Sequence, residues 1–289
     1  MTNLSLWKVS ELQKITGGKL IGNINIIEQD IFITGVSTDS RDISEGDMFV
    51  AIDGERDGHD YVIDAFISGA ELALVSKIPA GYKNEASLLI VENVLEALNN
   101  IAKNARKRFK GLVIAITGSV GKTSTKEMLK SALEPFGEVH ASPKSFNNHL
   151  GVPISLVTIP KDADFAVLEI GMNSPGEIEP LSRLAKPDHI VITTTGKSHT
   201  ENFDNMHQIA KEKASIVKGM AGSGKIFLST EGQLQDDIMK ILNDEQFSIV
   251  KFGTKAQAKF EIVHLQQNNS GTILKLKVPD GSNLYFKLS

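Results

Sequence analysis

The stretch IAITGSVGKTSTKEML, residues 114–129, points to a strand, a glycine-containing turn and a helix in close succession. An apolar run leads into Gly118 and Gly121, which are followed by Lys122, two hydroxyl residues and a helical pattern. Glycine lets backbone N–H groups turn toward an anion, and the N-terminus of a helix adds partial positive charge. The stretch therefore predicts a phosphate-binding turn. The alternative is a purely structural corner with a surface lysine.

The spacing of this turn differs from the general pattern G-x-x-x-x-G-K-[ST], because Ile116 stands where the first glycine of that pattern falls. We expect Lys122 to neutralise the terminal phosphates of ATP and Thr123 to bind Mg²⁺. The expected nucleotide contacts are Thr117, Gly118, Ser119, Val120, Gly121, Lys122, Thr123 and Ser124.

Length and composition narrow the class of protein. A chain of 289 residues is long enough for about two domains, each with its own core. The absence of cysteine excludes disulfides, thiolate catalysis and Cys-ligated zinc, and it favours a cytoplasmic location. A net charge of −4 gives no broad electrostatic basis for binding nucleic acid, and no apolar run approaches the ~20 residues that span a bilayer. Chemistry on small molecules is favoured.

Patterning along the chain predicts an α/β protein with two domains. Residues 1–82 alternate short helix and strand signals and are expected to form a small N-terminal α/β domain. Residues 83–289 are expected to form a central domain, in which near-continuous apolar strands alternate with helices around a parallel sheet. Residues 259–289 read as antiparallel strands joined by NNSG and PDGS turns, a small β appendage.

Further polar residues fall at the ends of predicted strands. Glu169 ends the apolar run FAVLE, and His199 follows the run HIVIT. Ligand-binding residues of open α/β sheets gather at the carboxyl ends of the strands, so Thr123, Glu169 and His199 together predict a metal site. Each has a simpler explanation when taken alone: Glu169 would pair with a surface lysine, and His199 would have a structural role.

Two other segments are polar without deciding a function by themselves. Asn147 and Asn148, in SFNNHLGVPISL, would bind a polar substrate or cap a helix. The helical stretch MHQIAKEKASI carries Lys211 and Lys213, which ordinarily would belong to a solvated face.

Taken together and in this order, these segments resemble the Mur ligase family, the ATP-dependent enzymes that add amino acids to UDP-N-acetylmuramoyl peptides. TGSVGKTSTKEML is similar to its phosphate loop, AVLEIGMNSPGEI to its metal strand, and FDNMHQIAKEKASI to the helix that carries its modified lysine. The segment GVSTDSRDISEGDMFVAIDGERDGHD resembles the UDP-binding domain of the tripeptide-adding and D-alanyl-D-alanine-adding members. Taken as a whole, the chain is most similar to the members that add D-alanyl-D-alanine.

The resemblance implies an ATP- and Mg²⁺-dependent amide ligase that acts through an acyl phosphate. It implies that His199 and a carbamylated Lys213 hold a second Mg²⁺, and that Lys122, His199 and Lys213 serve catalysis. Asn147 and Asn148 would face the substrate. The expected contacts to the UDP-sugar are Ser40, Arg41 and His59.

The chain also departs from the family pattern. TTTGKSH replaces a stretch that usually reads TNIGPAH, which places Thr194 and Lys197 where an amide and a proline are expected. The family's third domain is expected to be lacking. Three hypotheses follow: a ligase without this domain, a binding protein completed by a partner chain that supplies it, and a P-loop ATPase unrelated to the cell wall. The UDP-binding resemblance argues against the last.

Overall fold

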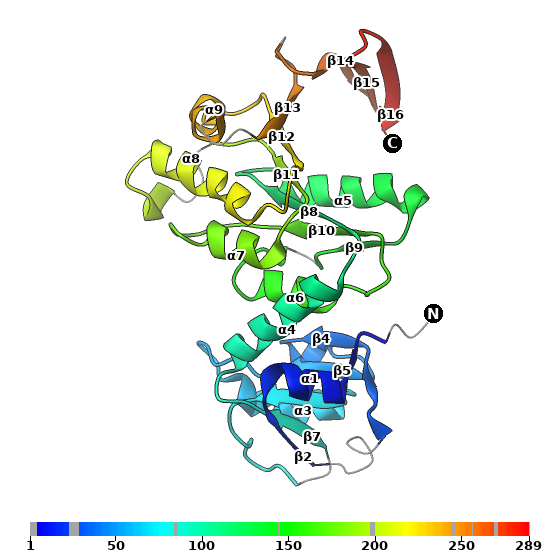
Figure 1. Ribbon diagram of the computed structural model, residues 1–289, viewed down its shortest axis with the longest axis vertical. Helices are drawn as coiled ribbons and strands as arrows, with labels where there is room; N and C mark the ends of the chain where they lie inside the picture. Colours follow the sequence, from blue (N-terminus) through cyan, green and yellow to red (C-terminus); the bar gives the residue numbers. More distant parts are fainter. Residues whose placement is uncertain are drawn as a thin grey trace. The chain divides into compact units, whose positions relative to one another are not determined.

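The computed structural model describes residues 5–22, 29–83, 86–143, 145–196, 200–243, 247–255, 257–268 and 271–288. By its internal contacts the chain divides into two compact units. The first comprises Met1–Gly111 and Leu150–Asp164, and the second comprises Leu112–His149 and Phe165–Ser289. Each unit carries its own sheet, as the ribbon drawing shows (Figure 1).

The first unit is built on a five-stranded sheet with the order β2-β7-β6-β5-β4. Strands β4 to β7 run parallel to one another, and β2 pairs with β7 in the antiparallel sense. A separate antiparallel pair joins β1 to β3. The strands are β1 (Trp7–Lys8), β2 (Lys19–Ile21), β3 (Phe32–Ile33), β4 (Gly35–Ser37), β5 (Asp47–Val50), β6 (Leu72–Val75) and β7 (Ser87–Ile90).

The helices of this unit are α1 (Val9–Thr16), α3 (Val62–Ile67), α4 (Val94–Arg108), α6 (Gly151–Val157) and the 3₁₀ helices η1 (Ser40–Asp42) and η2 (Gly58–Tyr61). Local sequence fixes their ends. Asn93 caps α4 by accepting the Glu96 N–H at 2.9 Å, and α1 ends at Gly17, whose φ of 66° favours glycine. Side chains of α3 and one face of the sheet form a buried core that includes Phe49, Val62 and Leu88.

The second unit contains a nine-stranded sheet with the order β16-β15-β14-β13-β12-β11-β8-β10-β9. The pairs from β9 to β14 are parallel, and β14 to β16 form an antiparallel extension. The parallel strands are β8 (Leu112–Thr117), β9 (Val139–Ala141), β10 (Phe165–Glu169), β11 (His189–Ile192), β12 (Lys225–Ser229) and β13 (Ser248–Gly253). This is the predicted parallel-sheet domain, and its fold class is confirmed.

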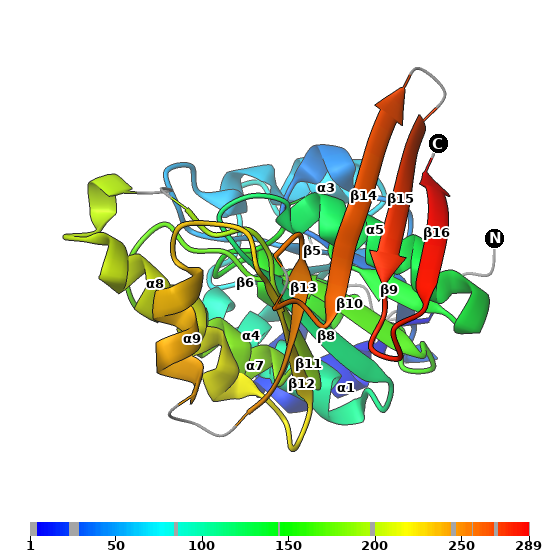
Figure 2. The same cartoon turned by 90° about the horizontal axis from the view of Figure 1, so that it is seen from above.

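Helices cover both faces of this sheet. They are α5 (Lys122–Leu133), α7 (Ile178–Ala185), α8 (Met206–Ala214) and α9 (Gln235–Asn243), with 3₁₀ helices η3 (Glu134–Phe136), η4 (Thr200–Asn202) and η5 (Ser215–Gly219). In Figure 2, α5 is drawn to one side of the central parallel strands, and α8 and α9 to the other. Val113 and Ile116 of β8 are both fully buried although they point to opposite faces, which is why the strand reads as a continuous apolar run.

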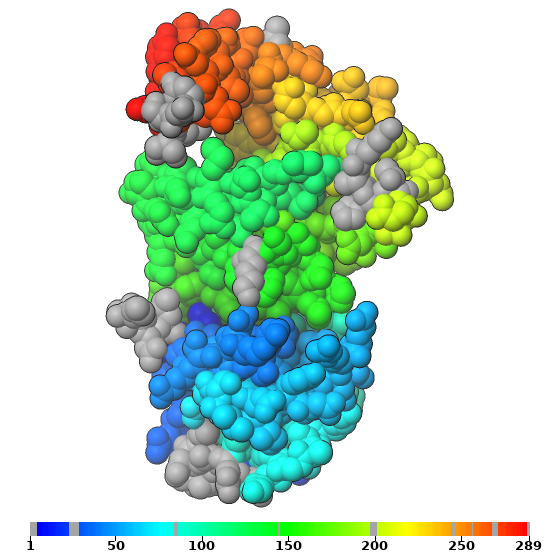
Figure 3. Space-filling model, turned by 180° about the vertical axis from the view of Figure 1, so that it is seen from behind, coloured from blue at the N-terminus to red at the C-terminus, as the bar shows by residue number. Residues whose placement is uncertain are grey.

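The predicted β appendage consists of β14 (Phe260–Asn268), β15 (Gly271–Lys277) and β16 (Asn283–Leu288). The PDGS turn between the last two contains Gly281 with a φ of 83°, and the Val278 N–H donates to the Ser282 carbonyl at 3.0 Å. The orange and red atoms of these strands form an outer part of the second unit in the space-filling view (Figure 3). The side chains of Leu265 and Tyr285 in this appendage are well exposed.

The contacts divide the chain at a different place from the expected boundary between residues 82 and 83. Residues 83–111 lie in the first unit because β7 joins its sheet and α4 packs on α1. Residues 150–164 also return to this unit: the Trp7 Nε1–H donates to the Val157 carbonyl at 2.8 Å. In the parts of the chain that the structure describes, no helix has the length and apolar character needed to cross a bilayer.

Candidate functional site

The glycine turn follows β8, which lies between β10 and β11 in the parallel sheet of the second unit. Two of its residues need glycine for different reasons. Gly118 has a φ of 150°, and a Cβ there would meet the Thr193 Oγ1 at 1.9 Å. Gly121 precedes α5 with a φ of 85° and open space around its α-carbon. The first glycine thus allows close packing, and the second allows a left-handed backbone.

Backbone hydrogen bonds fix the first half of the turn. The N–H groups of Ser119 and Val120 both donate to the Thr194 carbonyl, at 3.0 and 3.4 Å, and the Ser119 hydroxyl donates to the Gly196 carbonyl at 2.9 Å. These two amides therefore face the segment after β11. The amides open to an anion are those of the first turn of α5, which have no acceptor within the helix. Among the described residues no side chain caps this N-terminus.

Lys122 folds back over the turn. Its Nζ donates to the Gly118 carbonyl at 2.9 Å. Burial lowers the pKa of Lys122, and the negative charge of Glu169 opposes this effect. A cation held at the mouth of a glycine turn is suited to neutralising phosphate charge.

Glu169 is the carboxylate at the centre of the site. It ends β10 and is 1% exposed. One carboxylate oxygen accepts the Thr123 hydroxyl at 2.9 Å, and the other accepts the Asn147 amide at 2.7 Å. The Asn147 carbonyl accepts the Gly171 N–H at 2.8 Å. Three segments that are distant in sequence thus meet at one carboxylate, at the edge where the sequence predicted them.

Lys213 reaches this region from α8. Its side chain is 2% exposed, so it does not belong to a solvated face. Burial, together with the positive charge of Lys122, lowers its pKa to about 8, against a smaller opposing effect of Glu212. The Glu212 side chain is itself engaged, because it accepts the N–H groups of Gly176 and Ile178 at 2.8 Å each. A substantial fraction of Lys213 is therefore neutral near pH 8.

The oxygen atoms around Glu169 fit a magnesium ion. The Thr123 hydroxyl lies within hydrogen-bond distance of the carboxylate, and Mg²⁺ prefers such oxygen ligands. Within the described residues, no three His, Asp or Glu side chains gather into a ready-made metal site. His199 and Lys197 lie outside the described residues. The ligands of a metal ion at this place would thus be Glu169 and Thr123 from the described residues, together with phosphate oxygens of a nucleotide or water.

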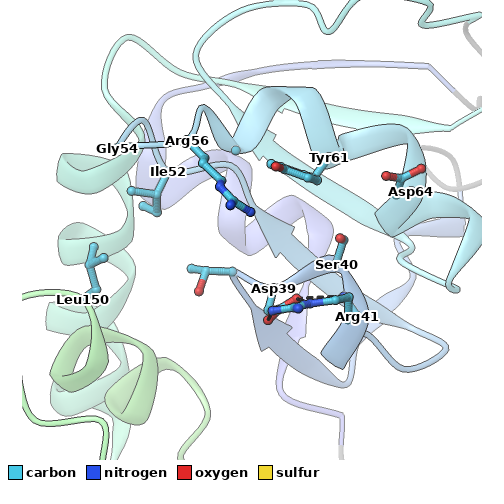
Figure 4. A pocket seen from close by; sticks show the side chains of 11 residues that line it. Asp39, Ser40, Arg41, Ile52, Gly54, Arg56, Tyr61, Asp64 and Leu150 are labelled. Atoms are coloured by element: carbon cyan, nitrogen blue, oxygen red, sulfur yellow. Dashed lines mark hydrogen bonds and ion pairs between the residues drawn. The ribbon is translucent and has the colours of Figure 1, made fainter.

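A second candidate site is a cavity of about 600 Å³ in the first unit. It is lined by Thr38, Asp39, Ser40, Arg41, Ile52, Gly54, Arg56, Gly58, Tyr61, Asp64 and Leu150. Figure 4 shows Arg56 extending into the space between Tyr61 and Asp39. Arg41 turns toward Asp39 instead and forms a pair of hydrogen bonds with its carboxylate at 2.8 and 2.6 Å. The cavity offers hydroxyl, guanidinium and aromatic groups at the carboxyl ends of β4 and β5.

Of the three expected UDP-sugar contacts, Ser40 and Arg41 line this cavity and His59 does not. The His59 ring is 3% exposed, its Nδ1 lies 2.6 Å from an Asp57 carboxylate oxygen, and its Nε2 accepts the Ser76 N–H at 2.9 Å. Both ring nitrogens are therefore engaged within the fold. His59 therefore lies outside the lining of this cavity, and its contact with the UDP-sugar stays a prediction.

The structure thus brings together most of the nucleotide and metal residues expected from sequence. Lys122, Thr123, Glu169 and Asn147 are linked through the contacts above, and Lys213 is an electrostatic neighbour of Lys122. Asn148 follows Asn147 in the same loop, and Ser124 lies in the first turn of α5. The sequence analysis did not name Arg56 and Tyr61, which line the cavity. Arg56 could have been found, because it is a cation in the glycine-containing run after β5, and a cation beside such a turn is a signal for anion binding.

Two family models match this chain. The Mur ligase middle domain model matches residues 116–289, and a model described as Mur ligase family, catalytic domain, matches residues 32–109. The UDP-N-acetylmuramoyl-tripeptide–D-alanyl-D-alanine ligase of Rickettsia prowazekii (strain Madrid E) is 34% identical over 284 residues, which are 95% of this chain and 62% of that protein.

Two solved structures extend the comparison. MurF from Acinetobacter baumannii matches 99% of this chain and 61% of its own with a TM-score of 0.80 and 27% identity. MurF ligase from Thermotoga maritima in complex with ADP matches 88% of this chain and 58% of its own with a TM-score of 0.71 and 27% identity. The chain thus spans about three fifths of the length of these relatives. The matched middle-domain model covers more than half of the chain, and the chain belongs to the Mur ligase family.

Proposed function

We propose that this chain carries the nucleotide- and sugar-binding parts of an ATP-dependent amide ligase of peptidoglycan precursor synthesis. The ligase would join D-alanyl-D-alanine, or a related amine, to the carboxylate of a UDP-N-acetylmuramoyl-peptide. The observation that carries the proposal is the meeting of Lys122, Thr123 and Glu169 at the carboxyl edge of a Mur ligase middle domain. The name of the Rickettsia prowazekii relative, UDP-N-acetylmuramoyl-tripeptide–D-alanyl-D-alanine ligase, supports the choice of substrates.

The reaction proceeds in two transfers. A carboxylate oxygen of the substrate attacks the γ-phosphorus of ATP, ADP leaves, and an acyl phosphate forms. The amine nitrogen then attacks the acyl carbon, loses a proton, and the tetrahedral intermediate expels inorganic phosphate to leave an amide. Both steps bring anions together, so catalysis depends on alignment and on neutralising charge.

The chain's own residues supply these two effects. Lys122 and the first-turn amides of α5 would hold the β- and γ-phosphates. Thr123 and Glu169 would hold one Mg²⁺, which supplies further charge neutralisation when bound. Asn147, fixed by Glu169 and Gly171, would orient the substrate together with Asn148. His199 is part of the proposal as a ligand of a second Mg²⁺.

Lys213 is proposed to be carbamylated. Carbamylation requires a neutral amine, whose nitrogen attacks the carbon of CO₂ and loses a proton to give an anionic carbamate. The lowered pKa of about 8 makes the neutral amine available under mild conditions. The product would convert a buried cation beside Lys122 into an anionic ligand, and it would remove the repulsion between the two ammonium groups.

The cavity in the first unit is proposed to bind the UDP-sugar. Its volume of about 600 Å³ lies within the usual range for small-ligand sites of about 300–1,000 Å³. Arg56 and Ser40 offer donors to a diphosphate, and the Tyr61 ring offers a flat apolar surface. In this proposal the substrates are cytoplasmic precursors.

The proposed function is tested by phosphate release from ATP, measured with the UDP-N-acetylmuramoyl-tripeptide, with D-alanyl-D-alanine, and with both. Release that requires both substrates supports a ligase. Binding of the UDP-sugar without release supports the alternative of a binding protein that a partner completes. Equal release with and without the sugar nucleotide would contradict the cell-wall assignment, because it would indicate an ATPase of another kind.

A further inference from the structure

Lys126 is a buried cation that none of the roles above uses. It lies one helical turn after Thr123 on α5, and its side chain is 1% exposed. Its Nζ donates to the Ser142 carbonyl at 2.7 Å and lies 3.0 Å from a carboxylate oxygen of the largely exposed Glu127. Burying an ammonium group costs several kcal/mol unless it is well paired, so a lysine at this position calls for an explanation beyond filling space.

The partner of Lys126 marks the start of the loop that carries Asn147. Ser142 directly follows β9 and is 2% exposed. Its N–H donates to the Val167 carbonyl at 3.1 Å, and its hydroxyl accepts the Glu169 N–H at 3.3 Å. The third polar group of Ser142 is its carbonyl, which accepts the hydrogen bond from Lys126. All three backbone and side-chain groups of Ser142 are thus bound to α5 or β10.

This arrangement connects the buried cation to the candidate metal site through short steps. Ser142 contacts the backbone of Glu169, and five residues later Asn147 contacts the carboxylate of the same residue. A shift of Ser142 would therefore move both the backbone of Glu169 and the start of the Asn147 loop. Loss of a group that orients a metal-binding residue typically lowers the affinity for the metal about 10–100-fold.

We propose that Lys126 is a positioning residue: it fixes Ser142 and thereby sets the orientation of Glu169 and Asn147 toward a magnesium-bound nucleotide. The inference rests on the proposed nucleotide function and adds a residue to it. An apolar side chain of similar length would fill the same volume between α5 and β9. It would leave the Ser142 carbonyl without its donor, so packing would be kept while the position of the loop would be lost.

The test compares nucleotide affinity with and without metal. ADP is titrated into each protein in saturating Mg²⁺ and again in EDTA. The dissociation constant in EDTA divided by that in Mg²⁺ reports how much the metal strengthens binding. We expect Lys126→Met to reduce this ratio at least about 10-fold relative to wild type, because the orientation of Glu169 is disturbed. Glu127→Gln, which removes only the exposed partner of Lys126, is the matched control and should keep the wild-type ratio.

A lower melting temperature with an unchanged ratio in Lys126→Met would overturn the inference, since it would mean that the lysine only stabilises the fold. Ser142→Ala serves where Lys126→Met does not fold, because it removes a single hydroxyl and the contact to the Glu169 N–H. Ser142→Ala should also lower the ratio. An unchanged ratio in this variant would overturn the positioning role and leave the proposed nucleotide function standing. Failure of the wild type to bind ADP in either condition would instead contradict the proposed function itself.

Discussion

Lys122 and Glu169 define the site at the scale of single residues. The lysine is held at the Gly118 carbonyl, and the carboxylate is held by Thr123 and Asn147, so both groups are oriented before a ligand arrives. The charge of each influences the other, because Glu169 opposes the lowering of the Lys122 pKa. An oriented cation beside an oriented carboxylate suits the proposed binding of a nucleoside triphosphate and its magnesium ion.

Replacement of Lys122 by alanine should weaken the binding of Mg-ATP by about 10- to 100-fold, the loss expected for one charge-assisted contact. Stability should change little, because the side chain makes one hydrogen bond to its own turn. Calorimetric titration and thermal unfolding measure the two effects separately. Lys130→Ala, near the end of the same helix, is the control. Normal ATP binding by Lys122→Ala would mean that the turn is purely structural.

Lys213 predicts a pH dependence of stability. Its pKa falls from the ordinary 10.5 to about 8 in the folded chain, so between these values the unfolded state binds a proton that the folded state does not. The stability of the wild type should therefore rise, relative to Lys213→Met, as the pH increases from about 8 to 10.5. Below about pH 8 the difference between the two proteins should stay constant.

Denaturant unfolding of both proteins in CO₂-free buffer tests this pH dependence, since removing CO₂ prevents carbamate formation. A difference in the free energy of unfolding that stays constant between pH 8 and 10.5 would contradict the low pKa. It would also remove the physical basis for carbamylation at this lysine.

Single residues also show where sequence reasoning ended. His59 was expected to contact the UDP-sugar because its segment resembles the UDP-binding domain of the family. Its role depends on Asp57 beside it and on Ser76, 17 residues away, and the burial of the ring follows from those contacts. Lys126 gives no sequence signal at all, because its neighbour Glu127 makes the pair look like part of a charged surface.

At the scale of elements, the turn between β8 and α5 determines where the site forms. Both glycines have positive φ, yet only Gly118 faces a neighbouring side chain, that of Thr193. The Thr193 hydroxyl donates to the Val120 carbonyl at 2.7 Å, which holds the tip of the turn. The turn is therefore fixed at its start and open at the N-terminus of the helix.

This difference predicts unequal effects of two alanine substitutions. Gly121→Ala should cost about 1–2 kcal/mol of unfolding free energy, the strain of a left-handed backbone alone. Gly118→Ala should cost about 2–4 kcal/mol, because overpacking against Thr193 adds to an unfavourable φ. Denaturant unfolding of both variants makes the comparison. An equal cost for the two would contradict the close packing of Gly118.

Elements were predictable where their signal is local. The continuous apolar runs of β8 and β10 predicted a buried parallel sheet, and the polar residues after them predicted a candidate site at its carboxyl edge. The assignment of strand β7 and helix α4 to the first unit could not be predicted in this way. Pairing of β7 with β2 and β6 is a non-local choice that periodicity does not encode.

At the scale of the whole molecule, two units each carry a candidate site at the carboxyl edge of a parallel sheet. In the second unit this is the cluster around Glu169, and in the first it is the cavity around Arg56. Family membership was predictable because several motifs occur in a fixed order, although the glycine turn lacks the first glycine of the general pattern. The chain matches about three fifths of its relatives' length. The first experiments therefore measure the binding of nucleotide and of UDP-sugar at these two candidate sites.

Calorimetric titration with UDP-N-acetylmuramoyl-tripeptide tests the central claim most directly. We predict one binding site per chain, weakened at least about 10-fold in Arg56→Ala with an unchanged melting temperature, because one guanidinium contact to a diphosphate is lost. His59→Ala should instead lower the melting temperature through the loss of buried hydrogen bonds. Absence of binding by the wild type would contradict the assignment to cell-wall precursors and leave a Mur ligase fold with another substrate.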